Sequence, residues 1–237
     1  MSRFSKFLAV AAATLMAAAC ADNARVEGQL SDAPSSEVIV KLLEVNRYEV
    51  LDTVKTDEAG RFSYKVEVEK GNPEVVYVFY KNTKVASLLL EAGDNVTVEA
   101  DTLGNYTVAG SEESLKLAQV EKDFAASLLK LNDLALKVET ASEKEAKEIS
   151  REMSQEYIRY YRDRVKYIIQ NSRSLTVVPV LFQNFSAELP VFAQNTDAIH
   201  FRNIADSLEL VYPESKYVQA LRKEADERYR YLELQTY

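Results

Sequence analysis

Few side chains in this 237-residue chain could carry out covalent or metal chemistry, because it has one cysteine, Cys20, and one histidine, His200. A zinc site or a serine–histidine pair needs a further histidine or cysteine at a suitable spacing. With Cys20 as its single thiol, the chain has no intrachain disulfide, no CxxC redox pair and no zinc knuckle. We therefore expect His200 to be a helix side chain at the edge of the core, and we expect no metal and no cofactor.

The 37 acidic residues form no recognisable catalytic or calcium-binding pattern. Glu112 and Glu113 fall in the first turn of a predicted helix, where negative charge suits the helix dipole. Asp57 and Asp94 lie in glycine-containing turns, without the alternating acids of a calcium-binding loop. A glycosidase would need two acids that converge in one cleft, and glycine-rich phosphate-binding motifs are absent. We assign no catalytic residue.

Tyrosines and arginines alternate in two stretches of the second half, at 157–167 and 228–231. Such alternation can stack on nucleobases or sugars. It can equally mark a helix whose tyrosines pack inward while its arginines lie outside, against Glu152, Glu156 and Asp163. We expect core packing, with a partner-binding aromatic surface as the alternative. Because nearby acids cancel most of the positive charge, we expect no nucleic-acid partner.

Residues 1–21 have the order of a secretory signal. Arg3 and Lys6 precede an apolar run of 13 residues, 7–19, which ends in three alanines directly before Cys20. The run is too short to span a bilayer, which takes about 20 apolar residues. A cysteine after small residues resembles the lipobox of bacterial lipoproteins, with Ala17 at the position usually occupied by leucine. The alternative is an ordinary signal peptide, cut at an A-x-A site, that leaves a free thiol.

The lipobox resemblance implies a signal peptide at 1–19, cleavage before Cys20 and acylation of its thiol. Two or three acyl chains would anchor the protein stably to a membrane. Residues 20–25 would then be a short lipidated tether, and the protein would lie in the cell envelope, at the outer membrane facing the periplasm or the cell surface. Removal of 1–19 changes the formal net charge from −8 to −10. This acidic balance also argues against nucleic acid.

Eight short segments with period-two alternation predict β-strands between residues 26 and 110. In one of them, Phe62, Tyr64 and Val66 alternate with polar residues. With turn residues between the segments and no helical stretch among them, the pattern indicates an antiparallel sandwich or an open barrel, and we predict a β-sandwich domain over 26–110. The predicted strands are 26–30, 37–45, 50–55, 61–68, 75–80, 85–91, 95–99 and 106–108.

From Ser111 onward the hydrophobic period changes to three and four residues, which predicts an α-helical bundle domain over 111–237. The fold class is thus α+β. The first helix runs to about residue 138, and a capping box, Ser142 with Glu145, opens the second. A short helix from Pro179 through Ala187 and two more at 197–211 and 215–234 follow. The inward stripe predicted for the second helix is Ile149, Met153, Tyr157, Tyr161, Val165 and Ile168.

A series of short motifs carries a family resemblance. These are Asp57-x-x-Gly60-x-Phe62, the segment 90–94 before a strand, the segment 108–111 that opens the helical region, and 215–221. Their order is similar to the N-terminal module, a domain of unknown function, of thiol–disulfide interchange lipoproteins of Bacteroidetes. The resemblance implies a thioredoxin-like domain after this module. We expect the chain to lack it, because it has no CxxC pair and ends at Tyr237.

Three Asp-Thr/Ser-aliphatic triplets resemble the O-glycosylation signal of the same bacterial group. They make Thr53, Thr102 and Ser207 candidate glycosylation sites.

Together these features favour a lipid-anchored cell-envelope binding or scaffolding protein without catalytic activity of its own. It would present a sandwich edge or a helix groove to a protein, peptide or glycan. One alternative is an accessory of periplasmic thiol–disulfide metabolism that docks on a separate thioredoxin-like partner. Another alternative is an unrecognised hydrolase.

Overall fold

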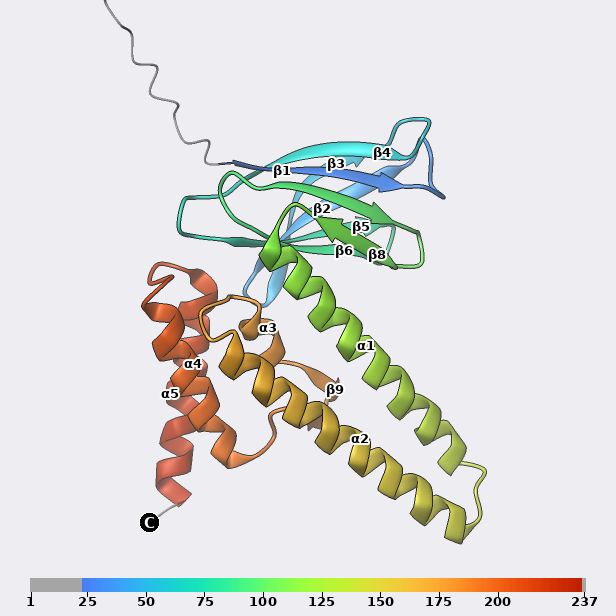
Figure 1. Ribbon diagram of the computed structural model, residues 1–237, viewed down its shortest axis with the longest axis vertical. Helices are drawn as coiled ribbons and strands as arrows, with labels where there is room; N and C mark the ends of the chain where they lie inside the picture. Colours follow the sequence, from blue (N-terminus) through green and yellow to red (C-terminus); the bar gives the residue numbers. More distant parts are fainter. Residues whose placement is uncertain (1–22, 236–237) are drawn as a thin grey trace, which may run out of the picture.

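The computed structural model describes residues 23–235, so the signal segment 1–19 and the lipidation site Cys20 lie outside the described residues. The described part has the predicted α+β fold: two four-stranded sheets form a sandwich, and helices follow it (Figure 1). The strands of the sandwich are β1 (Asn23–Leu30), β2 (Glu37–Glu44), β3 (Arg47–Lys55), β4 (Arg61–Glu67), β5 (Glu74–Tyr80), β6 (Thr83–Leu90), β7 (Asn95–Ala100) and β8 (Tyr106–Ala109).

The two sheets have the strand orders β4-β1-β7-β8 and β3-β2-β5-β6. Within the described sandwich, every neighbouring pair is antiparallel except β1 and β7, which run parallel with Val26 opposite Val96. After β6 the chain crosses from one sheet to the other and enters β7 at the end where β1 also begins. Alternation along the strands turns aliphatic side chains such as Val38, Val78 and Leu88 into a core between the sheets.

Two turns of the sandwich need glycine. Gly60, with φ of 75°, closes the turn before β4, and a Cβ there would lie 2.1 Å from the Leu30 carbonyl oxygen. Asp57 holds this turn by accepting the backbone N–H groups of Ala59 and Arg61, each at 2.8 Å. At Gly110, with φ of 91°, a Cβ would lie 2.0 Å from a backbone oxygen of β7. Both glycines therefore allow the chain to pass close to neighbouring backbone.

Two long helices, α1 (Glu112–Val138) and α2 (Glu143–Gln170), form an antiparallel hairpin that extends away from the sandwich (Figure 1). Ser111 caps α1, and the predicted capping box at Ser142 and Glu145 begins α2. Among the residues that the structure describes, no helix has the length and apolar character to cross a membrane.

The buried face of α2 differs from the predicted stripe. Its buried residues are Glu156, Tyr160, Arg164 and Ile168, whereas Tyr157 and Tyr161 lie at the margin of the core. The expectation that Glu156 and Arg164 lie on the outer face is therefore wrong. Both face α1, where Arg164 donates to Asp123 at 2.9 Å and Glu156 accepts from Ser127 at 2.6 Å. Because α1 supplies polar partners for both side chains, two charged residues can lie on the buried face of α2.

The predicted helix through Ala187 is also wrong, because α3 (Val177–Leu181) ends before it. Instead β9 (Asn184–Ser186) and β10 (Leu189–Pro190) form a small hairpin. This hairpin places the Phe185 ring 5.3 Å from the Tyr160 ring and 5.4 Å from the Phe124 ring, centroid to centroid. Packing against the α1–α2 hairpin thus outweighs the local preference for helix. The remaining elements are η1 (Asn195–Asp197), α4 (Ala198–Glu209) and α5 (Lys216–Gln235).

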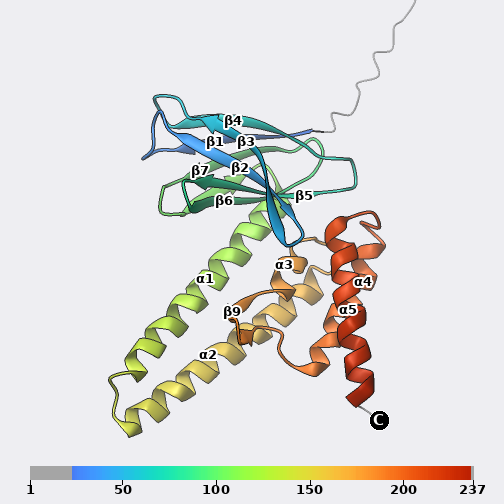
Figure 2. The ribbon, with the colours of Figure 1, turned by 180° about the vertical axis from the view of Figure 1, so that it is seen from behind.

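The start of α5 joins the helical region to the sandwich. The Tyr217 hydroxyl accepts the Val75 backbone N–H at 3.1 Å and donates toward the Leu43 carbonyl at 2.8 Å. Lys216 bridges Glu44 and Glu74 at 2.7 and 2.8 Å. The helices α3, α4 and α5 therefore lie beneath the β3-β2-β5-β6 sheet, as the reverse view shows (Figure 2).

Candidate functional site

The three candidate glycosylation residues lie in unrelated places. Thr53 is exposed on β3. Thr102 lies in the β7–β8 turn, and its hydroxyl donates to Asp32 at 2.6 Å. Ser207 lies on α4, and its hydroxyl donates to the Asn203 carbonyl at 2.9 Å. Only the Thr53 hydroxyl thus stands on an open strand surface, and the three do not form one site. Cys20, the lipidation candidate, lies outside the described residues.

His200 lies partly buried on α4, with its ring 6.2 Å from the Phe192 ring. Over the described range 23–235, no group of three or more histidine, cysteine, aspartate or glutamate side chains is placed to hold a metal ion. The tyrosine–arginine stretch on α2 packs against α1 and the β9–β10 hairpin. Core packing is therefore the main role of this stretch.

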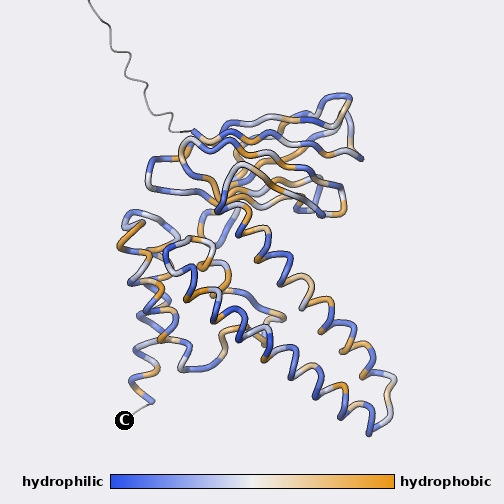
Figure 3. Tube along the Cα trace, viewed as in Figure 1, coloured by the Kyte–Doolittle hydropathy of each residue, from blue (hydrophilic) through white to orange (hydrophobic). Residues whose placement is uncertain are grey.

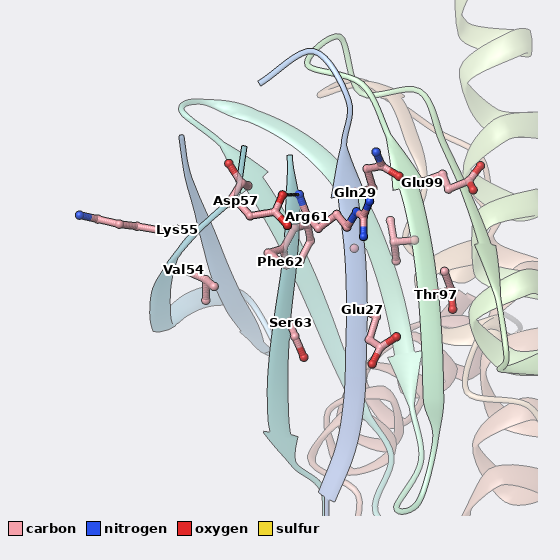
Figure 4. A pocket seen from close by; sticks show the side chains of 13 residues that line it. Glu27, Gln29, Val54, Lys55, Asp57, Arg61, Phe62, Ser63, Thr97 and Glu99 are labelled. Atoms are coloured by element: carbon pink, nitrogen blue, oxygen red, sulfur yellow. Dashed lines mark hydrogen bonds between the residues drawn. The ribbon is translucent and has the colours of Figure 1, made fainter. Parts of the chain in front are cut away.

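A hollow of about 590 Å³ lies on the outer face of the β4-β1-β7-β8 sheet. It is lined by polar side chains of adjacent strands, since Gln29 stands opposite Arg61 on one side and Glu99 on the other. Figure 4 shows that Glu27 and Glu99 point in different directions and that Lys55 extends away from the hollow. An open hollow without converging acids is a poor site for acid–base catalysis.

The opposite sheet carries a cluster that we call the aromatic face: Lys41, Tyr48, Tyr77 and Phe79. Alternation places these side chains on the outer surface of β2, β3 and β5, because their neighbours Val40, Val76 and Val78 point into the sandwich. Lys41 stands directly opposite Tyr77 across the β2–β5 pair. Three adjacent strands therefore contribute to one surface.

The rings of the aromatic face are mutually packed. Tyr48 meets Tyr77 edge-on at 5.4 Å and Phe79 at 5.8 Å, centroid to centroid. The Lys41 Nζ lies 4.1 Å from the centre of the Phe79 ring, a cation–π contact. Yet Tyr48 remains 53% exposed and its neighbour Val50 is 59% exposed. The surface is preorganised and still open to solvent.

One side of the aromatic face is closed by α1. Lys84 lies 5.1 Å from the centre of the Tyr77 ring and is paired with Glu121 of α1 at 2.6 Å. Glu121 also accepts from Ser87 at 2.8 Å and from Tyr106 at 3.1 Å. Burial, together with the charge of Glu121, raises the pKa of Tyr77 far above its ordinary value, so its hydroxyl stays neutral. Lys84 is thus occupied by α1, whereas Lys41 is a cation of the aromatic face that α1 does not cover.

An edge strand extends the aromatic face. Among the described strands, β3 pairs with β2 on one side and ends the sheet order on the other. An edge strand can accept an extended peptide through backbone hydrogen bonds, while exposed aromatic residues and a cation recognise its side chains. Sequence reasoning missed this surface because it considered tyrosines only beside arginines. The outward positions of Lys41, Tyr77 and Phe79 in the alternating strands were the available signal.

The fold is that of an α+β protein in which a β-sandwich carries the aromatic face on its outer surface and a helical region packs against the same sheet. Residues 24–117 match the family described as Domain of unknown function (DUF4369). The match spans the sandwich from the second residue of β1 to the second turn of α1. No curated protein matches the chain.

Proposed function

We propose that this protein is a lipid-anchored cell-envelope binding or scaffolding protein that holds a protein or peptide partner on its aromatic face. The observation that carries the proposal is the exposure of Tyr48 and Val50 beside the packed rings of Tyr77 and Phe79. Aromatic residues are enriched in the cores of protein interfaces, and rigid rings lose little conformational entropy on binding.

The chemistry of the partner follows from the two components of the surface. The β3 edge offers backbone groups to an extended segment, and Lys41 offers a positive charge above the Phe79 ring. A segment with an apolar or aromatic residue next to an acidic one would satisfy both components. The helical region supports this role by packing against the same sheet at Leu43, which stands opposite Tyr48, and at Val75, so it borders the aromatic face.

The anchor is the second part of the proposal. The signal pattern at 1–19 and the cysteine that follows it support acylation of Cys20 and a location at the outer membrane of a Bacteroidetes cell. Cys20→Ser should abolish labelling by a fatty-acid probe and release the protein into the soluble periplasmic fraction. A variant that stays labelled and membrane-bound would contradict the anchor.

The binding role is tested with two double variants of matched character. Tyr48→Ala with Val50→Ala removes the exposed part of the aromatic face, whereas Leu129→Ala with Leu136→Ala removes two exposed leucines on α1. Cross-linking in intact cells and affinity capture should lose the partner at least tenfold for the first pair and retain it for the second. Equal recovery from both folded variants would refute the proposal.

A second candidate function concerns the identity of that partner. The match at 24–117 covers the Asp57, Gly60 and Phe62 turn that resembles thiol–disulfide interchange lipoproteins. This overlap favours an accessory role in periplasmic thiol–disulfide metabolism, with docking on a separate thioredoxin-like protein. Capture of a thioredoxin-fold oxidoreductase that depends on Tyr48 and Val50 would support this role. Capture of a surface glycan or a transport complex would instead favour a general scaffold.

A further inference from the structure

The described chain begins very close to the proposed anchor. β1 starts at Asn23, three residues after Cys20, and an extended chain spans at most about 3.6 Å per residue. Asn23 would therefore lie within roughly 11 Å of the acylated cysteine. This argument rests on the proposed lipid anchor. It means that the part of the molecule around Asn23 would be held against the bilayer.

The turn between α4 and α5, residues 210–215, lies on the same side of the molecule as Asn23. The Asn23 carbonyl accepts the Gly93 backbone N–H at 2.9 Å, which fixes the β6–β7 turn beside the start of β1. Tyr212 packs against the core cluster that includes Leu89 of β6, and burial together with the charge of Glu91 in that turn raises the pKa of the Tyr212 hydroxyl to about 12. Figure 1 shows the start of β1 and the α4–α5 turn on the same side of the molecule.

This turn exposes apolar side chains. Leu210 is 81% exposed and Val211 is 39% exposed, directly after α4 ends at Glu209. The hydropathy trace shows the hydrophobic colour at this corner of the molecule (Figure 3). The chain covers the neighbouring Leu208 completely, so it buries one leucine of the segment and leaves the next in solvent. An exposed leucine at the tip of a turn beside a membrane tether is suited to contact lipid.

We propose that the α4–α5 turn rests on the bilayer that holds Cys20 and inserts Leu210 and Val211 into its interfacial layer. The acidic groups nearest this turn are Glu91, Asp94, Glu113, Glu209 and Glu214, and the cations beside it are each paired with acids: Lys116 with Glu113, Lys216 with Glu44 and Glu74, and Arg222 with Glu209. Anionic headgroups would repel such a surface, so the bilayer it fits is zwitterionic.

The test uses a matched pair of leucines. Leu103, in the β7–β8 turn, is 82% exposed and lies at the opposite end of β7 from the β6–β7 turn. Leu210→Cys and Leu103→Cys are each made in the full-length chain, purified in acylated form and labelled with a polarity-sensitive fluorophore. Each protein is reconstituted in phosphatidylcholine vesicles that contain lipids with a nitroxide quencher near the headgroup.

We expect quenching of the probe at position 210 to be at least twice that at position 103, and to fall when phosphatidylglycerol is added. Equal quenching of the two probes in acylated, vesicle-bound protein would overturn this inference and leave the anchor intact. Absence of acylation, seen by mass spectrometry, would instead be the failure of the proposed anchor. Leu210→Ser in the Leu103→Cys background, which should leave the signal at 103 unchanged, checks that the substitution at 210 does not alter the fold.

Discussion

The sandwich and the helical region bury different kinds of side chain. The sandwich core is aliphatic, built from valine, leucine and alanine around Phe62. The helical core contains the rings of Tyr160, Phe192 and Phe201, and three charged residues, Glu156, Arg164 and Asp197, are buried in the same region. The stability of the sandwich should therefore depend on the shapes of its core side chains. The stability of the helical region should depend also on the charges of its buried side chains, and so on pH.

The largest effect is expected at the centre of the helical core. Phe201 is fully buried, with its ring 5.6 Å from Phe182, 6.4 Å from Phe192 and 4.1 Å from the Arg228 guanidinium. Phe201→Ala should lower the free energy of unfolding by about 3–5 kcal/mol, measured by urea titration. The same change at Phe182, which is 41% exposed, should cost less than half as much. Similar losses would mean that the aromatic core is not centred on Phe201.

The next effect tests whether the sandwich core is limited by shape. A Cβ at Gly28 would lie 2.1 Å from the ring of Phe62, its cross-strand partner. Gly28→Ala should therefore cost about 2–3 kcal/mol through overpacking. Phe62→Leu shortens the opposing side chain, so the double variant should be more stable than the sum of the two single losses predicts. Strictly additive losses would show that the two residues do not compete for space.

The same contrast explains which parts of the structure the sequence predicts. Strict alternation in residues such as Phe62, Tyr64 and Val66 predicts strands, because an aliphatic core accepts period-two patterns without exceptions. The α2 stripe was misplaced by one position, because Glu156 and Arg164 occupy the buried row and hydropathy assigns charges to the surface. The β9–β10 hairpin was missed because contacts of Phe185 with distant rings decide its conformation.

The candidate site was only partly predictable for a related reason. The alternation of apolar and polar residues indicates which side chains lie on each face of a strand, and it places Tyr77 and Phe79 on the outer face of the sandwich. It does not indicate which part of an outer face the helices will cover. That depends on long-range contacts such as those of Tyr217 with Val75 and of Glu121 with Lys84. The sandwich edge was anticipated as a binding element, while its aromatic face needed the structure.

A third prediction concerns charge in the helical region. Hydrogen bonds from Arg159 lower the pKa of Glu156 to about 2. Burial of the carboxyl acts in the opposite direction, whereas hydrogen bonds from Lys130 and Ser127 lower the pKa further. A carboxyl with a depressed folded-state pKa stabilises the fold above its unfolded pKa of about 4.3, and this contribution is lost as the pH falls toward 2. Because Lys130 and Arg159 are more than half exposed, we expect only about 1–2 kcal/mol.

Glu156→Gln should thus be less stable than the natural chain at pH 7, and the difference should shrink between pH 5 and pH 3. Urea titrations at several pH values measure this difference. Glu152→Gln is the matched control, since Glu152 lies exposed one turn earlier on α2 and should follow the natural chain at every pH. If the difference in unfolding free energy between Glu156→Gln and the natural chain stays constant with pH, Glu156 stabilises the fold by packing rather than by its charge.

The smallest effect on stability is expected at the buried cation Arg164. Arg164 donates to Asp123 and stacks on the rings of Tyr160 and Tyr167, at 4.9 and 5.4 Å from their centres. Within the described residues, its Nε and Nη1 atoms are buried without a hydrogen-bond partner. The burial cost of these donors offsets much of what the ion pair contributes. Arg164→Met keeps the apolar contacts and removes that cost.

Whether Arg164→Met stabilises or destabilises the protein depends on Asp123, which loses its ion-pair partner. Asp123 keeps a side chain that is 37% exposed and also accepts from Gln119, so it can be hydrated after Arg164 is removed. We therefore expect Arg164→Met to change the unfolding free energy by less than about 1 kcal/mol in urea titration. A loss above about 3 kcal/mol, the cost typical of breaking a buried ion pair, would show that Asp123 depends on Arg164. The stability of the helical core would then depend on Arg164 as well as on Glu156.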